Sequence, residues 1–164
     1  MFQWWQGVLV ACVLGLAGCS GAPLKNGRES PDALARAVLD AVARRDGDAL
    51  RALTFDEEEF RELVWPDLPA SRPERNLPFG YVWTDLRRKS DAGLASVLEA
   101  HGGRVLDLVG VSFRAETTQY RTFLVHRDSQ VTVRDATRRQ QVVQLFGSVI
   151  EKDGRFKVFS YVVD

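Results

Sequence analysis

The side chains that could carry out chemistry in this 164-residue chain are few and lie far apart in the sequence. An isomerase-type site needs a carboxylate or imidazole base beside hydrogen-bond donors that stabilise a developing oxyanion. The candidate bases on elements that could point inward are Asp85, Asp107 and His126. The candidate donors are the hydroxyl groups of Tyr81, Tyr120 and Tyr161.

No recognisable motif joins these candidates into a catalytic set. His126 precedes Arg127 and Asp128, a pattern typical of a solvated turn, and apolar residues flank Asp107 on both sides, which leaves its orientation open. The sequence has no phosphate-binding glycine loop, no G-x-S-x-G, no H-E-x-x-H and no Cys/His cluster. We therefore expect no catalytic residues, no metal site and no cofactor, with Tyr81, Trp83 and Tyr120 as candidate walls of a ligand pocket.

Composition limits the classes of partner. Lys plus Arg and Asp plus Glu number 22 each, so the chain has no formal net charge and no basic stripe, which argues against nucleic acid. The two cysteines are Cys12 and Cys19, and Cys12 lies within an apolar run. That run, Val8 to Ala17, is about half the length of a membrane-spanning helix and suits the core of a secretory signal.

The run ends in Leu16-Ala17-Gly18-Cys19, which resembles the lipobox of bacterial lipoproteins. The resemblance implies cleavage before Cys19, acylation of that cysteine including palmitate, and a membrane anchor of several acyl chains. Ser20, rather than aspartate, then favours the outer membrane of a Gram-negative cell, with the domain facing the periplasm and an inner-membrane location as the alternative. The other interpretation is an uncleaved, short, buried apolar segment.

Three segments follow from this interpretation. Residues 1–18 are expected to be a lipoprotein signal peptide, residues 19–30 the lipidated cysteine with a flexible tether, and residues 31–164 a single α+β domain. Ser20 to Glu29 is rich in glycine and polar residues and shows no periodicity, as in flexible linkers.

The first half of the domain reads as helical. Ser30-Pro31-Asp32 predicts a helix N-terminus, and the first helix is expected to end at Gly47. A short helical piece follows over 48–53, and Asp56 with Glu59 forms a capping box for a third helix. The acids Glu57 to Glu59 are interpreted as favourable first-turn charges rather than metal ligands. After a proline-rich loop, a helix is predicted from Thr84 to His101, ended by Gly102-Gly103.

From Arg104 onward the apolar period changes to two, which predicts strands. We expect strands over 105–115, 118–126, 131–134, 139–151 and 156–163, with an Asp153-Gly154 hairpin turn before the last. Helices followed by an antiparallel meander indicate an α+β fold with the helices packed on one face of a curved sheet.

This pattern resembles the nuclear transport factor two-like superfamily over residues 31–164. The likeness rests on the helical corner Arg45 to Leu50 and on the tail from Val142 to Tyr161. It implies a cone-shaped pocket enclosed by the sheet and helices, in a superfamily that includes ketosteroid isomerases, polyketide cyclases, dehydratases, transport factors and non-catalytic domains. Fold alone does not choose among these functions.

Two hypotheses therefore stand from the sequence. The first is a lipid-anchored, non-enzymatic envelope protein whose domain binds a protein partner or an apolar small molecule. The second is a periplasmic isomerase, cyclase or lyase of the ketosteroid-isomerase-like type that uses Asp85, Asp107 or His126. A structural role as a spacer in an envelope complex is a third possibility.

Overall fold

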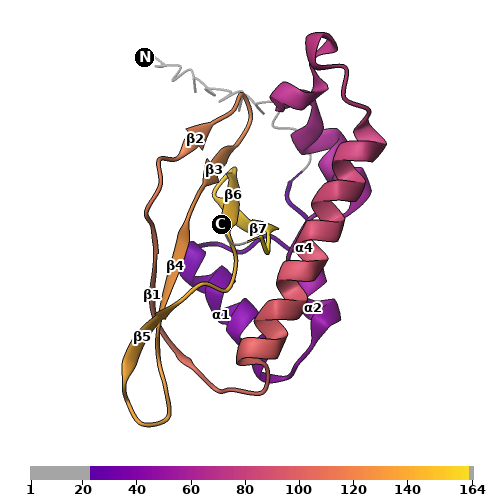
Figure 1. The fold of residues 1–164 in the computed structure, drawn as a ribbon. Coiled ribbons are helices and arrows are strands. Elements are labelled where there is room, and N and C mark those ends of the chain that lie inside the picture. The colour runs from indigo at the N-terminus through magenta and orange to yellow at the C-terminus, as the bar shows by residue number, and fades with distance from the viewer. Residues whose placement is uncertain (1–22, 163–164) are drawn as a thin grey trace, which may run out of the picture.

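The computed structural model describes residues 23–162, so the lipobox and Cys19 lie outside the described residues. Figure 1 shows the helices on one side of the molecule and the strands on the other. The helices are α1 (Pro31–Ala43), α2 (Gly47–Ala52), α3 (Glu57–Glu59) and α4 (Phe79–His101). Between α3 and α4 lie a π-turn, Phe60–Val64, and three 3₁₀ turns, Trp65–Asp67, Pro69–Ser71 and Pro73–Arg75.

Each of the first three helices begins at a side chain that accepts a backbone N–H. The Ser30 hydroxyl accepts from Ala33 at 3.0 Å, and the Asp56 carboxylate accepts from Glu59 at 2.7 Å, so both predicted helix starts are confirmed. Asp46 caps α2 in the same way through the amide of Ala49. Gly47 therefore opens α2, whereas the sequence suggested that it ends the preceding helix.

Helix α4 begins at Phe79, earlier than the predicted start at Thr84, and it ends at Gly102 as expected. Its buried residues, Ser90, Leu94 and Val97, recur at helical spacing and so lie on one face. Gly93 on the same helix faces the backbone of Tyr161, where the carbonyl oxygen would lie only 2.1 Å from an added Cβ. Contact this close between a helix and the C-terminal segment requires glycine at this position.

The strands form two antiparallel sheets. The three-stranded sheet has the order β1-β4-β5, with β1 (Asp107–Phe113), β4 (Ser129–Arg134) and β5 (Gln140–Val143). The four-stranded sheet has the order β2-β3-β6-β7, with β2 (Thr118–Gln119), β3 (Leu124–His126), β6 (Ser148–Lys152) and β7 (Arg155–Ser160). The α+β class, with helices first and antiparallel strands after them, is confirmed, as is the Asp153-Gly154 hairpin between β6 and β7. The expected single meander is wrong, because the strands form two sheets in which β1 pairs with β4 and β3 pairs with β6.

Two predicted long strands are each divided in the structure. The segment 118–126 forms a hairpin of β2 and β3, in which the Tyr120 amide donates to the Phe123 carbonyl. The segment 139–151 is split between the two sheets, as β5 and β6. Leu145 and Phe146, between these strands, are both fully buried. Both side chains pack into the same core cluster, whereas adjacent residues of one regular strand point to opposite faces, so a single continuous strand does not place both there.

Side chains fill the interior between helices and sheets. A large cluster joins α1, α2 and α4 to β1, β4, β5 and β7, and includes Leu34, Val38 and Tyr161 with no exposed surface. A second cluster lies near the start of α4 and contains Leu24, Phe60, Val64, Phe123 and Ile150, among others.

Packing of the described chain begins before α1. The side chain of Leu24 is only 5% exposed, and Arg28 exchanges two backbone hydrogen bonds with Phe156, at 2.8 and 2.7 Å. The domain boundary expected at residue 31 thus leaves out a segment, from Leu24 to Arg28, that is held against the β-sheet.

Candidate functional site

The two carboxylates proposed as bases lie on the surface. Asp85 is bound by two cations of its own helix, Lys89 at 2.7 Å and Arg88 at 2.8 Å, and these hydrogen bonds lower the pKa of Asp85 below its usual value. Asp107 is exposed at the start of β1, opposite Arg134 of β4. A carboxylate with a lowered pKa is a weaker base, so Asp85 is poorly suited to proton abstraction.

His126 is the one candidate base that is largely buried, with 15% of its side chain exposed. Its Nε2 lies 2.8 Å from the Glu151 carboxylate and its Nδ1 lies 3.0 Å from the Thr117 hydroxyl. Its ring stacks on Phe113 at 4.7 Å between centroids, with Phe156 at 6.2 Å. Both ring nitrogens are engaged, and the ring packs against Phe113 and Phe156. His126 therefore joins β3 to β6 through its contact with Glu151.

The candidate tyrosine donors are not brought to these bases. The Tyr161 hydroxyl donates to the Leu50 carbonyl at 2.8 Å inside the core, where burial raises its pKa. Tyr120 stacks on Phe123, and Tyr81 is 66% exposed on α4. Among residues 23–162, no tyrosine hydroxyl is hydrogen-bonded to Asp85, Asp107 or His126.

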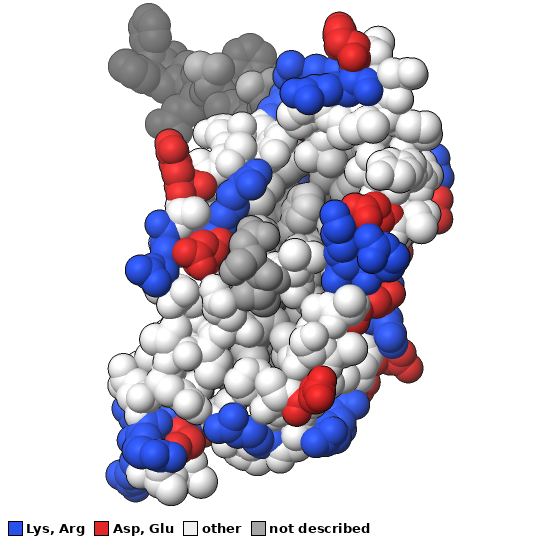
Figure 2. All heavy atoms as spheres, in the orientation of Figure 1, with Lys and Arg blue, Asp and Glu red and all other residues white. Residues whose placement is uncertain are grey.

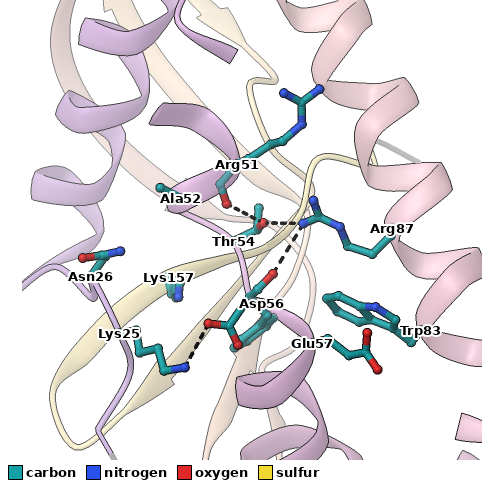
Figure 3. A pocket seen from close by; sticks show the side chains of 11 residues that line it. Lys25, Asn26, Arg51, Ala52, Thr54, Asp56, Glu57, Trp83, Arg87 and Lys157 are labelled. Atoms are coloured by element: carbon teal, nitrogen blue, oxygen red, sulfur yellow. Dashed lines mark hydrogen bonds and ion pairs between the residues drawn. The ribbon is translucent and has the colours of Figure 1, made fainter. Parts of the chain in front are cut away.

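Of the three candidate pocket walls, Trp83 lines a pocket of the described residues, together with charged residues that the sequence analysis did not select. Figure 3 shows this pocket, with a volume of about 430 Å³ between α2, α3, α4 and the segment at Lys25. Arg87 reaches in from α4 and donates to the Thr54 hydroxyl at 3.1 Å and to the Phe55 carbonyl at 3.4 Å. Its guanidinium also lies 5.6 Å from the Trp83 ring.

The cations around this pocket are already paired with carboxylates. Lys25 binds Asp56 and Glu58 at 3.0 and 2.8 Å, and these contacts raise its pKa. Arg51 binds Asp48 and Asp91 in the same manner. The charged side chains around this pocket therefore largely neutralise one another. Two further open pockets, of about 340 and 320 Å³, lie on the surface elsewhere.

The pocket floor contains an ion pair that sequence analysis missed. The Lys157 ammonium lies 2.5 Å from the Glu59 carboxylate, and both side chains are at most 2% exposed. The second carboxylate oxygen of Glu59 accepts the backbone N–H of Lys25 at 2.7 Å. Glu59 therefore binds two distant segments, instead of completing the predicted capping box with Asp56. The one signal in the sequence was Lys157, a charged residue among the apolar residues of the predicted last strand.

The outer face of the three-stranded sheet is open. Val131, Val133 and Val143 point into the core, so the alternate residues Thr132 and Val142, which are paired across β4 and β5, point outward. Val142 is 55% exposed. Figure 2 shows a largely uncharged surface here, above the basic tip of the β4–β5 hairpin with Arg138 and Arg139.

Val109 and Val105, beside the same sheet, are also exposed, at 44% and 77%. In addition, β1 and β5 are both edge strands of this sheet, with one side free of strand partners within residues 23–162. A face that exposes valines and is bordered by open edges is a typical surface for protein contact, and here Asp107 and Arg134 lie at one end of it.

No protein-family model matches the chain, and no curated protein or solved structure shows significant similarity to it. Within the described residues, no group of three or more histidine, cysteine, aspartate or glutamate side chains is placed to hold a metal ion. No helix of that part of the chain is long and apolar enough to cross a membrane.

Proposed function

We propose that this protein is a lipid-anchored, non-enzymatic protein of the bacterial cell envelope, held in the outer membrane through Cys19. In this proposal the domain faces the periplasm and binds a protein partner. The lipobox supports the anchor. The exposed outer face of the β1-β4-β5 sheet, with its exposed valines and with Asp107 and Arg134 paired at one end, supports the binding role and is the observation that carries it.

A protein partner fits the geometry better than an apolar small molecule. Much of the interior is packed with apolar side chains, and the pocket at Trp83 has charged side chains in its wall that pair with one another. By contrast, Val109 and Val142 expose apolar surface on a sheet whose edge strands offer unpaired backbone groups. A partner strand could bind there by strand addition, which gains main-chain hydrogen bonds as well as apolar contact.

The isomerase-type alternative has no geometric support from the candidate bases, because Asp107 is exposed, Asp85 is paired with Lys89 and Arg88, and His126 is engaged by Glu151 and Thr117. The nuclear transport factor two-like architecture stays a proposal. Its support is the order of helices before strands and the closing β6–β7 hairpin.

Site-specific photocrosslinking in living cells tests the binding role. A benzoylphenylalanine placed at Val142 is expected to form a discrete crosslinked product with a partner protein, because this exposed side chain lies on the open face beside the free edge of β5. The matched control is the same probe at Ala95, an exposed residue of α4 on the opposite side of the molecule, where no such product is expected.

The Val142 product should also disappear when Val109→Asp is introduced, since a charge on the same face opposes apolar contact. Mass spectrometry of the product separates a foreign partner from a second copy of the chain. No crosslink at Val142, or equal crosslinking at Val142 and Ala95, would contradict the proposed binding face.

A further inference from the structure

The described chain is fixed to the domain from Leu24 onward, close behind the proposed lipidation site. Leu24 is buried in the cluster around Phe60 and Phe123. The amide of Lys25 donates to Glu59, and its ammonium group binds Asp56. Any free tether between Cys19 and the domain is therefore limited to Ser20–Pro23.

This tether is short compared with the domain. Five residue steps separate Cys19 from Leu24, and a fully extended chain covers at most about 18 Å over that number. Helix α4 alone has 23 residues, or about 35 Å at 1.5 Å per residue. With acyl chains of Cys19 in the bilayer, the point where the chain enters the domain must lie at the membrane surface.

That point belongs to one end of the molecule, which we call the anchor end: Leu24, residues 66–78 and the β2–β3 turn Tyr120–Thr122. Figure 1 shows the loop before α4 and the β2–β3 turn on either side of the place where the described chain begins. Asp67 joins these two elements, because its carboxylate accepts from the Thr122 amide at 3.2 Å and binds Arg121 at 2.8 Å. The anchor end is thus one connected surface.

Its side chains suit a phospholipid headgroup layer. Arg72, Arg75 and Arg121 are exposed, against a single exposed acid, Glu74, in the same segments. Leu77 is 41% exposed, and Trp65 and Tyr120 are half-buried nearby. Arginine binds anionic headgroups, and tryptophan and tyrosine concentrate at the boundary between headgroups and acyl chains. Figure 2 shows the basic side chains at this end.

We propose that the anchor end lies on the bilayer surface, in contact with phospholipid headgroups. Helix α4 then runs away from the membrane, and the β4–β5 hairpin points into the periplasm with the open sheet face beside it. This proposal rests on lipidation of Cys19, and it adds a fixed orientation that lipidation alone does not require.

Fluorescence quenching of the lipidated full-length protein tests this orientation. The protein is reconstituted in vesicles of phosphatidylethanolamine and phosphatidylglycerol that carry a headgroup nitroxide. An environment-sensitive dye is attached through Glu74→Cys at the anchor end, or through Ala136→Cys in the β4–β5 turn as the matched control. Both positions are exposed. We expect several-fold stronger quenching at residue 74 than at residue 136.

A second variant tests the role of the short tether. Insertion of about twenty Gly/Ser residues between Ala22 and Pro23 adds a coil with a root-mean-square length of about 25 Å, and quenching at residue 74 should fall. Equal quenching at both positions, or stronger quenching at residue 136, would overturn the orientation.

The intact mass of the same sample tests the lipidation of Cys19 separately from the orientation of the domain. A lipidated Cys19 with no selective quenching overturns only the orientation. An unlipidated chain overturns the proposed anchor together with the orientation that rests on it.

Discussion

Replacement of Lys157 by methionine is expected to destabilise the folded domain by about 3–5 kcal/mol. The change leaves the Glu59 carboxylate buried without its cation, and an unpaired buried charge is costly to keep out of water. The Glu59 carboxylate also accepts a hydrogen bond from the Lys25 amide. Removal of the Lys157 ammonium therefore affects the segment at Leu24 as well. Urea denaturation followed by circular dichroism measures the change in the free energy of unfolding.

Two controls isolate the buried pair. Lys89→Met removes an exposed ion pair with Asp85 and should cause no measurable loss of stability. The double variant Glu59→Leu/Lys157→Met should recover most of the loss, because two apolar side chains replace both charges at once. A Lys157→Met protein as stable as the parent would show that Glu59 and Lys157 do not form this pair.

Gly93→Ala is expected to cost about 3 kcal/mol, the upper part of the range for overpacked cores. The added Cβ would lie 2.1 Å from the Tyr161 carbonyl oxygen and 2.7 Å from its carbonyl carbon. These are backbone atoms, so α4 and the C-terminal segment must separate to accommodate the methyl group. Thermal unfolding of the variant measures the loss.

Gly80→Ala is the matched control on the same helix. Nothing lies within 4 Å of a Cβ added at Gly80, and alanine favours helix over glycine by about 1 kcal/mol. This variant should therefore be as stable as the parent or more stable. If Gly93→Ala is equally well tolerated, α4 does not pack against Tyr161 as closely as the structure has it.

Local signals in the sequence predicted the starts of α1 and α3 and the final hairpin. Ser30 and Asp56 act within three residues of themselves, and Asp153-Gly154 determines a turn without help from distant residues. The division of 139–151 into two strands depends on the core, where Leu145 and Phe146 both find partners. The alternation of apolar residues within 139–151 does not reveal this division into two strands.

The site was harder to predict than the fold for a related reason. Glu59 and Lys157 are 98 residues apart and pair only when α3 meets β7. Glu59 also has a sufficient local explanation as a first-turn acid, which hides its long-range role. Asp85 and His126 are both residue types that can act as bases. In the structure, however, Asp85 forms an ion pair with Lys89, and His126 is hydrogen-bonded to Glu151.

Intact-mass spectrometry of the protein extracted from membranes tests the proposed anchor most directly. We expect a chain that begins at Cys19 and carries a diacylglycerol on its sulfur, with a further acyl group on its amino terminus. Replacing Cys19 by serine should abolish this mass and release the protein from the membrane fraction. A chain that begins at Met1, or a Cys19 without lipid, would contradict the account.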